Sequence, residues 1–337
     1  MKRKMEIPTS DLKEGMILGE DIIVNNVIHI SAGHIIGRRT IEKLENIVKG
    51  KKVVVEIEEK NKVMDLIEET SEKIESIAVE LKEVIESIES EPHKCLPRLM
   101  DLGRKVQDMS FDLKLFFQYA PTKDSSGLDF YRHMVQVAIL SVNLARISRF
   151  SEEELFDIAL AGLLHDMGKV TVPDEILLKK GKLDEEEFEL IKKHCFDGYL
   201  KLSDIPLPAG VKRGIFEHHE KIDGSGYPRN LKEEEIHEYA KIIAVADIFD
   251  ALTSDRSYRN RNNPFEAFEI MIREFATKLD YKYLGDFIEN MAYLYIGNDI
   301  EFNEKVATVI RINPKDITRP LVCVEGDFID LYYERAL

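Results

Sequence analysis

The sequence predicts a mostly α-helical protein with a small α/β module at its N-terminal end and a short β-rich segment at its C-terminal end. Between residues 64 and 116, apolar side chains recur at alternating spacings of three and four residues, as they do in helices that pack along one face. Further along, apolar runs of helical period contain isolated histidines and aspartates. Only the two ends show short apolar runs separated by turns, which indicate strands.

Residues 1–60 are expected to form the small α/β module, with a possible input role. The apolar run IIVNNVIHI is followed by the turn SAGH, then by the helical stretch TIEKLENIVKG, which ends at Gly50, and finally by the strand-like VVVEIE. The signal that such a module would sense cannot be read from these residues.

Residues 61–122 are expected to form a helical hairpin or linker. Two seams of apolar residues, 64–88 and 99–116, flank the helix-breaking stretch EPHKC. A short connection favours two antiparallel neighbours within one chain. The alternative is a dimeric coil, so a homodimer through 61–122 stays open.

Composition limits the class of protein. The chain has 337 residues, 44% of them hydrophobic, which suits a globular core and more than one domain. The net charge of −16 argues against binding to polymeric nucleic acid, which relies on basic surface. Three widely spaced cysteines suggest neither a zinc ribbon nor a disulfide scaffold. With no long apolar span and no signal-peptide pattern, the expectation is no membrane association and a cytoplasmic location.

Two motifs predict a buried metal site. HDMGK covers 165–169 and HHEKIDGSGYP covers 218–228. Asp166 and Asp247 interrupt apolar helical runs, where a charged carboxylate needs a partner, and a metal cation is an obvious one. The consecutive His218 and His219 diverge by about 100° on a helix and are more easily satisfied by two neighbouring ions. A carboxylate that bridges such ions holds them about 3.5–4 Å apart, as in two-metal hydrolases, and Asp166 is the natural bridge.

These motifs resemble the HD-GYP family, a branch of the HD phosphohydrolase superfamily. In order along the chain, the resemblance rests on a helix carrying His133, on HDMGK, on His194 in KKHCFDGYLKL, on HHEKIDGSGYP and on ADIFDALTSDRSYR. It implies an HD-type helical bundle as the catalytic domain over 123–337, with 295–337 as a small β-rich extension. Residues 1–60 weakly resemble, through LKEGMILGED, a domain of unknown function often placed ahead of such domains.

The resemblance also implies the ligands. One ion would be held by His133, His165, Asp166 and Asp247, and Asp166 would bridge to a second ion held by His194, His218 and His219. Some family members add an acidic residue one turn before the first histidine, which recruits a third ion. Asp129 has that position, but the family residue is usually the longer Glu. Metal ligand and N-cap are equally good interpretations of Asp129.

Other residues are candidates for substrate contact. Lys169 is placed to contact a nonbridging phosphate oxygen, although most lysines are simply solvated. Tyr227, on the glycine-rich loop, suits stacking on guanine or packing on its own loop, and the loop is also a possible docking site for a protein partner. Arg256 and Arg259 suit phosphate or guanine edges. Asp250 is expected to orient Lys169 or Arg256, and Cys195 is expected to point away from the site as a packing residue.

The resemblance implies a metal-dependent phosphodiesterase for cyclic di-GMP. In such an enzyme a hydroxide shared by two ions would open the substrate to the linear pGpG, with continuation to GMP left open. Imidazole and carboxylate ligands suit two or three divalent ions, with Fe or Mn favoured. One alternative is a phosphodiesterase for cyclic GMP-AMP, and another is a non-catalytic cyclic-dinucleotide sensor or partner-docking protein. The complete ligand set favours catalysis.

Overall fold

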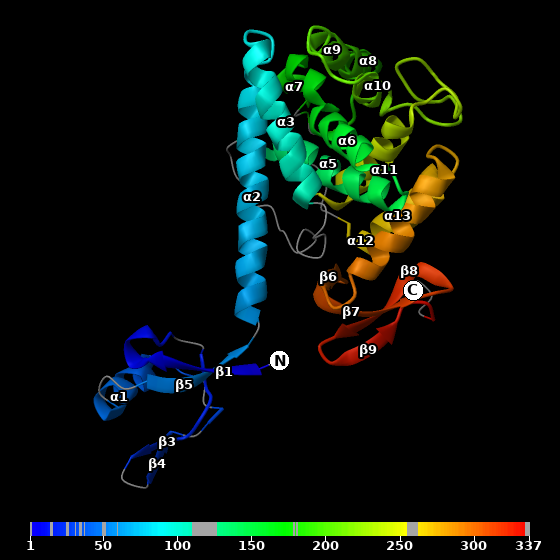
Figure 1. The fold of residues 1–337 in the computed structure, drawn as a ribbon. Helices are drawn as coiled ribbons and strands as arrows, with labels where there is room; N and C mark the ends of the chain where they lie inside the picture. Colours follow the sequence, from blue (N-terminus) through cyan, green and yellow to red (C-terminus); the bar gives the residue numbers. More distant parts are fainter. Residues whose placement is uncertain are drawn as a thin grey trace. The chain divides into compact units, whose positions relative to one another are not determined.

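The computed structural model describes residues 2–13, 16–24, 27–30, 32–33, 36, 38–48, 52–58, 60–109, 127–177, 179, 181–254 and 262–333. The chain divides into two compact units, Met1–Thr70 and Ser71–Leu337. Helices dominate the second unit and strands the first, as Figure 1 shows. The predicted fold class is confirmed: a mostly α-helical protein with a small N-terminal module and a small C-terminal sheet.

The first unit is built on a three-stranded antiparallel sheet in the order β1-β5-β2, with a separate β3-β4 hairpin. Its elements are β1 (Lys2–Pro8), the 3-10 turn η1 (Thr9–Asp11), β2 (Ile17–Leu18), β3 (Ile22–Val24), β4 (Val27–Ile30), α1 (Arg38–Val48) and β5 (Lys52–Glu58). A small core contains Leu18, Leu44 and Val55. Strand β1 was not foreseen, because KRKMEIP carries four charges and only two apolar side chains before its proline.

A helical hairpin follows, formed by α2 (Lys60–Ser87) and α3 (Pro92–Met109). The two helices run antiparallel, since Arg98 pairs with Glu83 and Lys105 pairs with Glu80. Their apolar seam is buried in the same core as the helices of the metal site. The boundary between the units therefore falls inside α2, after Thr70, and over 71–109 the seam is filled by contacts within the chain.

The helical bundle carries the candidate site. Its elements are α5 (Asp129–Ile147), α6 (Glu152–Leu164), η2 (Met167–Thr171), α7 (Asp174–Leu177), α8 (Glu185–Lys192), α9 (His194–Lys201), α10 (Ala209–Glu217), α11 (Glu238–Thr253), α12 (Pro264–Phe275) and α13 (Tyr281–Leu294). Capping boxes define several helix starts: the side chain of Ser151 caps α6 and that of Asn263 caps α12, each paired with a glutamate three residues on. Helix α5 buries most of its length, as expected for the centre of a bundle.

The C-terminal extension is an antiparallel meander in the order β6-β7-β8-β9. Its strands are β6 (Asp299–Phe302), β7 (Lys305–Asn313), β8 (Asp316–Val324) and β9 (Asp327–Asp330). Val309 and Val322 are fully buried in the main core, so one face of the sheet packs on the helical domain. In Figure 1 the sheet lies near α12 and α13, while α8, α9 and α10 lie at the other end of the unit.

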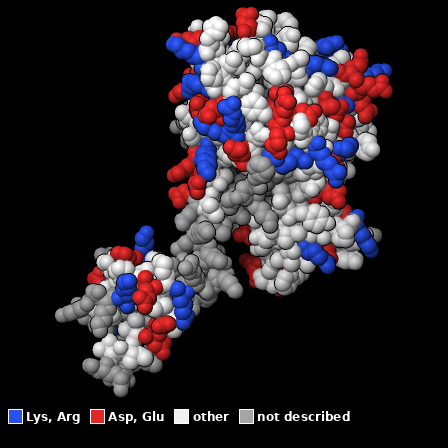
Figure 2. Space-filling view, viewed as in Figure 1, with Lys and Arg blue, Asp and Glu red and all other residues white. Residues whose placement is uncertain are grey.

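Acidic and basic side chains are interspersed over the face of the second unit drawn in Figure 2. Several of them form ion pairs along the helical hairpin, including Arg98 with both Glu80 and Glu83. Among the helices that the structure describes, none combines the length and the apolar character needed to cross a membrane.

Candidate metal centre

Five segments of the bundle bring seven histidine and aspartate side chains together. Helix α5 supplies one, the HDMGK turn after α6 two, the start of α9 one, the end of α10 two and the middle of α11 one. They form two groups whose potential ligand atoms lie within 4.8 Å of one another: Asp166, His194, His218 and His219, and His133, His165 and Asp247. These are the seven ligands expected from the sequence, apart from the doubtful Asp129.

A glycine permits the close approach of two of these segments. A Cβ atom on Gly168 would lie 2.0 Å from the carbonyl oxygen of His194, a contact that no side chain can make. The HDMGK turn therefore lies directly against the first turn of α9. This contact places Asp166 opposite His194.

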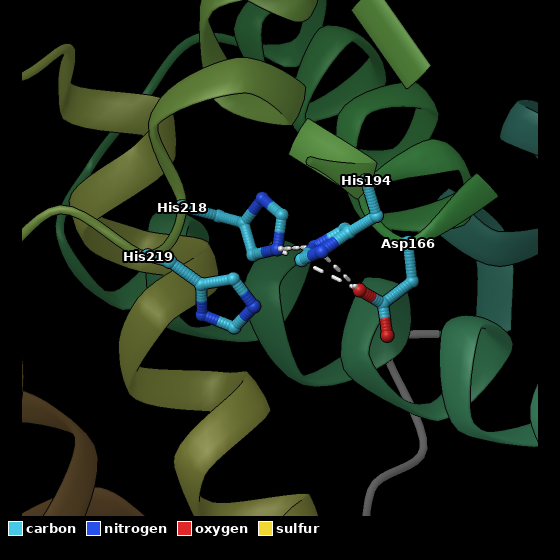
Figure 3. Close-up of side chains that lie close together, drawn as sticks. All are labelled: Asp166, His194, His218 and His219. Carbon is cyan, nitrogen blue, oxygen red and sulfur yellow. Dashed lines mark hydrogen bonds and ion pairs between the residues drawn. The ribbon is translucent and has the colours of Figure 1, made fainter. Parts of the chain in front are cut away.

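In the first group, one carboxylate oxygen faces two imidazole nitrogens (Figure 3). Asp166 Oδ1 lies 3.3 Å from His194 Nε2 and 3.7 Å from His218 Nε2, and the two nitrogens are 3.4 Å apart. Donor atoms bound to one ion at about 2.0–2.2 Å are about 2.8–3.6 Å apart in octahedral or tetrahedral geometry. Two of the three spacings lie within this range and the third, 3.7 Å, lies just above it, so the three atoms are close to the arrangement of ligands around one divalent ion. His219 lies beside them.

In the second group, the other oxygen of the same carboxylate takes part. Asp166 Oδ2 lies 3.5 Å from His165 Nε2 and 3.6 Å from His133 Nε2. His133 Nε2 is also 3.3 Å from Asp247 Oδ1. These spacings again suit one ion, so the carboxylate of Asp166 stands between two sets of ligands.

Hydrogen bonds behind the imidazoles orient them. The Nδ1 atoms of His165, His194 and His218 donate to the backbone carbonyls of residues three positions earlier, at 2.8, 2.6 and 2.7 Å. Because a carbonyl can only accept, the neutral rings keep the lone pair on Nε2, which faces the site. Such outer contacts fix the tautomer and the direction of metal-binding histidines.

The carboxylate of Asp250 orients the imidazole of His133 in the same way. Its Oδ2 lies 2.7 Å from His133 Nδ1, and the side chain is only 5% exposed. Sequence reasoning assigned it to Lys169 or Arg256, and the contact with His133 was missed. The two residues are 117 positions apart, so nothing in the sequence reveals that they meet.

The donor set itself fits divalent cations. His165 Nε2 and Asp166 Oδ1 are buried and have no hydrogen-bond partner among the described residues. Buried polar atoms are normally paired, and a carboxylate facing lone pairs calls for a cation between them. Imidazole nitrogens and carboxylate oxygens are ligands that Fe, Mn, Co and Zn all accept.

The pKa values divide the histidines into two kinds. Burial lowers the pKa of His218 to about 4, and burial together with the neighbouring His218 lowers that of His219 well below its usual value. Burial would also lower the pKa of His133, but hydrogen bonds with Asp166, Asp247 and Asp250 outweigh it and raise that pKa well above the usual value. The raised pKa of His133 therefore favours its protonated form in the metal-free protein, whereas the lowered pKa values of His218 and His219 favour the neutral imidazole.

Metal binding is expected to strengthen as the pH rises toward the pKa of His133, because an ion must displace that proton. Each pH unit below this pKa weakens binding by about tenfold, while His218 and His219 add no proton competition near neutrality. Calorimetric titrations in buffers of different ionisation enthalpy should detect release of at least about one proton per chain. Equal affinities at about pH 6 and pH 8 would contradict this protonation state.

Replacing Asp250 with asparagine is expected to weaken metal binding by about 10- to 100-fold while the fold is retained, because His133 loses its charged partner. Metal titration followed by circular dichroism checks both parts. Asp286→Asn is a suitable control, since this carboxylate pairs with Lys282 on its own helix. Unchanged affinity in the Asp250 variant would show that the contact is dispensable.

Lys169 and Tyr227 lie beside the two groups. Lys169 Nζ lies 2.5 Å from Asp166 Oδ2, and the side chain is 19% exposed, so it is not a freely solvated lysine. This charge, with His165, outweighs burial and holds the pKa of Asp166 well below its usual range. The half-buried ring of Tyr227 lies 4.8 Å from that of His219.

Glu220 holds the loop that carries Tyr227. Its buried carboxylate accepts hydrogen bonds from the backbone amides of Arg229 and Leu231, at 2.6 and 2.9 Å. Gly226 packs against the backbone of Glu220, where a Cβ atom would lie 2.4 Å from Cα. The loop is therefore fixed at both ends beside the histidines.

Two expectations, for Asp129 and Cys195, have other outcomes, and the one for Arg256 and Arg259 is not tested. Asp129 is not brought to either group: its side chain is 72% exposed and its carboxylate lies 2.6 Å from Arg132 Nη1. It is not the N-cap either, because Leu128 occupies that position and Asp129 is the first helical residue. Arg256 and Arg259 lie outside the described residues. The expectation that Cys195 points away from the site is wrong, since its sulfur lies 3.4 Å from His194 Nε2.

A helical bundle with two His/Asp groups that share one aspartate defines the HD class, and residues 122–282 match the family model of the HD domain. This segment of the chain is thus similar to HD domains. The resemblance is confirmed by the family model together with curated relatives, and a solved structure shares the fold. Bd1817, a HDG"Y"P protein from Bdellovibrio bacteriovorus, superposes with a TM-score of 0.54 over 86% of this chain and 99% of its own, and at 19% identity it shows a shared fold.

Three curated relatives are similar to part of this chain. Cyclic di-GMP phosphodiesterase PA4108 of Pseudomonas aeruginosa is 36% identical, over 58% of this chain and 47% of its own. A cyclic di-GMP phosphodiesterase of Thermotoga maritima is 44% identical, over 42% of this chain and 39% of its own. The 3'3'-cGAMP-specific phosphodiesterase 1 of Vibrio cholerae is 37% identical, over 49% of this chain and 38% of its own. The chain thus spans less than half the length of these relatives.

Proposed function

We propose that this protein is a metal-dependent phosphodiesterase that hydrolyses cyclic di-GMP to pGpG. One observation carries the proposal: the two oxygens of the buried Asp166 face different sets of histidines, as a carboxylate between two ions does. The HD domain and the names of the relatives supply the substrate class.

Seven residues would hold two ions, one with Asp166 Oδ1 and the other with Asp166 Oδ2. When bound, such ions lower the pKa of water toward about 7 and neutralise charge on a phosphodiester. The ammonium of Lys169 would meet a nonbridging phosphate oxygen, and Tyr227 would contact a guanine. Arg256 and Arg259 stay candidates for phosphate or guanine contact. Because the carboxylate of Asp129 is paired with Arg132, we favour two ions over three, with Fe or Mn as the ions.

A second substrate has a specific basis, since one relative is named for 3'3'-cGAMP. The sequence identities favour cyclic di-GMP. The cyclic di-GMP phosphodiesterase of Thermotoga maritima is 44% identical to this chain, and the 3'3'-cGAMP-specific phosphodiesterase 1 of Vibrio cholerae is 37% identical. The three cysteines are free, which agrees with action in a reducing cytoplasm.

The test is turnover by protein purified without air and loaded with Fe(II) or Mn(II). Chromatography should show loss of cyclic di-GMP and appearance of pGpG, with slower loss of 3'3'-cGAMP at equal concentration. Faster loss of 3'3'-cGAMP would reverse the substrate order. Fully loaded protein that hydrolyses neither dinucleotide would contradict the enzymatic function and favour a sensor.

A further inference from the structure

Helix α8 carries an exposed aromatic ring to the edge of the candidate metal centre. No residue of this helix is buried, and Phe188 is 45% exposed. The ring of Phe188 nevertheless lies 6.1 Å from that of Tyr227, with the two planes nearly perpendicular at 83°. Tyr227 lies 4.8 Å from His219 and 6.4 Å from His194, measured between ring centres. A single aromatic ring therefore separates Phe188 from two of the candidate ligands.

The place of this helix is fixed at both of its ends. A capping box between Asp184 and Glu187 begins α8, and Lys179 Nζ donates to Glu187 Oε1 at 2.6 Å. The helix ends at Lys192, two residues before His194. The ring of Phe188 is thus held near the site although it is not packed in the core.

Lys192 brings a positive charge to the same two rings. It lies four residues after Phe188 and so shares its helix face. Its Nζ atom lies 5.1 Å from the ring centre of Phe188 and 6.0 Å from that of Tyr227. Lys192 also pairs with Glu189, whose side chain is 59% exposed, and exposed ion pairs hold their partners weakly. Two aromatic rings and an available ammonium therefore meet beside His219.

A purine base has the shape and the polarity for this corner. Its flat face stacks on aromatic side chains, and aromatic rings also pack well at a right angle to one another. Guanine presents O6 and N7 as two acceptors on one edge, which suit an ammonium donor, whereas adenine has an amino group at the position of O6. A phosphate group would use the ammonium but not the rings. The combination thus favours guanine.

We propose that Phe188, Tyr227 and Lys192 form a guanine subsite beside the metal centre. The base would pack against the two rings, and its O6 and N7 would accept hydrogen bonds from Lys192 Nζ. This subsite rests on the proposed function and deepens it, because it adds two residues of α8 to the contact made by Tyr227. It also gives the chain a means of selecting guanine over adenine within a cyclic dinucleotide.

The test compares ligands with and without a base on the manganese-loaded full chain. In titration calorimetry, Phe188→Ala should weaken binding of GMP by about fivefold or more and leave binding of inorganic phosphate unchanged. Phe188→Tyr keeps an aromatic face and should bind GMP as the wild type does. The KM for cyclic di-GMP should rise in Phe188→Ala while kcat changes little. Phe196→Ala is the matched control, because Phe196 is a 52% exposed aromatic residue of α9 whose ring contacts Phe216 instead.

Lys192→Met tests the choice of base. The wild type should bind GMP more tightly than AMP, and the ratio of the two affinities should fall by about fivefold or more in this variant. Because GMP and AMP carry the same phosphate, the ratio is insensitive to any general effect of the lost charge on anion binding. An unchanged ratio would overturn the selection of guanine by Lys192.

The outcomes separate the subsite from the proposed function. Unchanged GMP binding in Phe188→Ala would overturn the subsite and leave the exposed ring to another occupant, such as a partner protein. Equal losses for GMP and phosphate would also overturn it, because the substitution would then disturb the metal ligands and not a base contact. The same holds if the loaded wild type binds no GMP. Protein that binds GMP as expected but hydrolyses no cyclic dinucleotide would contradict the enzymatic function and leave the subsite standing.

Discussion

Asp166→Asn is expected to abolish binding of both ions and to lower hydrolysis of cyclic di-GMP by about 10³-fold or more. The substitution keeps the size of the side chain but leaves a single oxygen, whereas each carboxylate oxygen now faces a different set of histidines. The amide also lacks the charge that holds Lys169 and offsets two cations. Elemental analysis and a turnover assay on the same sample measure both effects.

Asp197→Asn is the matched control for this variant. Asp197 lies on α9, three residues after His194, and its carboxylate accepts a hydrogen bond from Thr171. It belongs to neither group of potential ligands, so both ions and the activity should be retained. An Asp166→Asn protein that keeps one tightly bound ion would show that Asp166 does not bridge. One that keeps both ions and full activity would refute the site.

Removal of the ions is expected to lower the melting temperature by about 8–16 °C. A ligand at 1,000 times its dissociation constant stabilises the folded state by about 4 kcal/mol, and each kcal/mol corresponds to about 2–4 °C for a domain of this size. Without ions, unprotonated nitrogens and carboxylate oxygens are left facing one another in the core, as with His194, His218 and Asp166. Differential scanning calorimetry of chelated and reloaded protein measures the shift.

The Asp166→Asn variant supplies the control for this experiment. Its melting temperature should not respond to added ions, because the shared ligand is gone. A wild-type protein whose melting temperature is the same with and without ions would show that the seven residues do not form a tight site.

Three of the seven side chains that the structure brings together stand out locally in the sequence, whereas the full set was implied by the resemblance to the HD-GYP family. His165 and Asp166 follow an apolar run, and Asp247 interrupts one, so each is visible as a buried polar residue that needs a partner. The helices of the bundle follow from their apolar period for the same reason. These features require no knowledge of which segments meet.

The residue contacts that the sequence did not predict join segments that are far apart in the chain. The partner of Asp250 is His133, 117 residues earlier, and Arg132 is buried because Glu75 pairs with it across 57 residues. That contact, with the one to Asp129, changes the role of Asp129 from ligand or cap to ion-pair partner. Cys195 turns toward the site through the fold of the first turn of α9, which a residue pattern does not encode.

The position of the hairpin also depends on contacts between distant segments. The charged strand β1 pairs with β5 across the module, and its register becomes visible only when both strands are present. Helix α2 was expected to begin a helical hairpin or linker, and from Ser71 onward it shares its core with the helices of the bundle. Periodicity identifies a helix without identifying the core in which the helix is buried.

The most direct test of the account is to count ions and turnovers in one preparation. Protein purified without air is divided, one half is treated with chelator and then reloaded, and iron and manganese per chain are measured beside the conversion of cyclic di-GMP. We expect two ions per chain, conversion to pGpG in loaded protein, loss of both on chelation and recovery of both on reloading. Conversion that continues in fully metal-free protein would contradict the account.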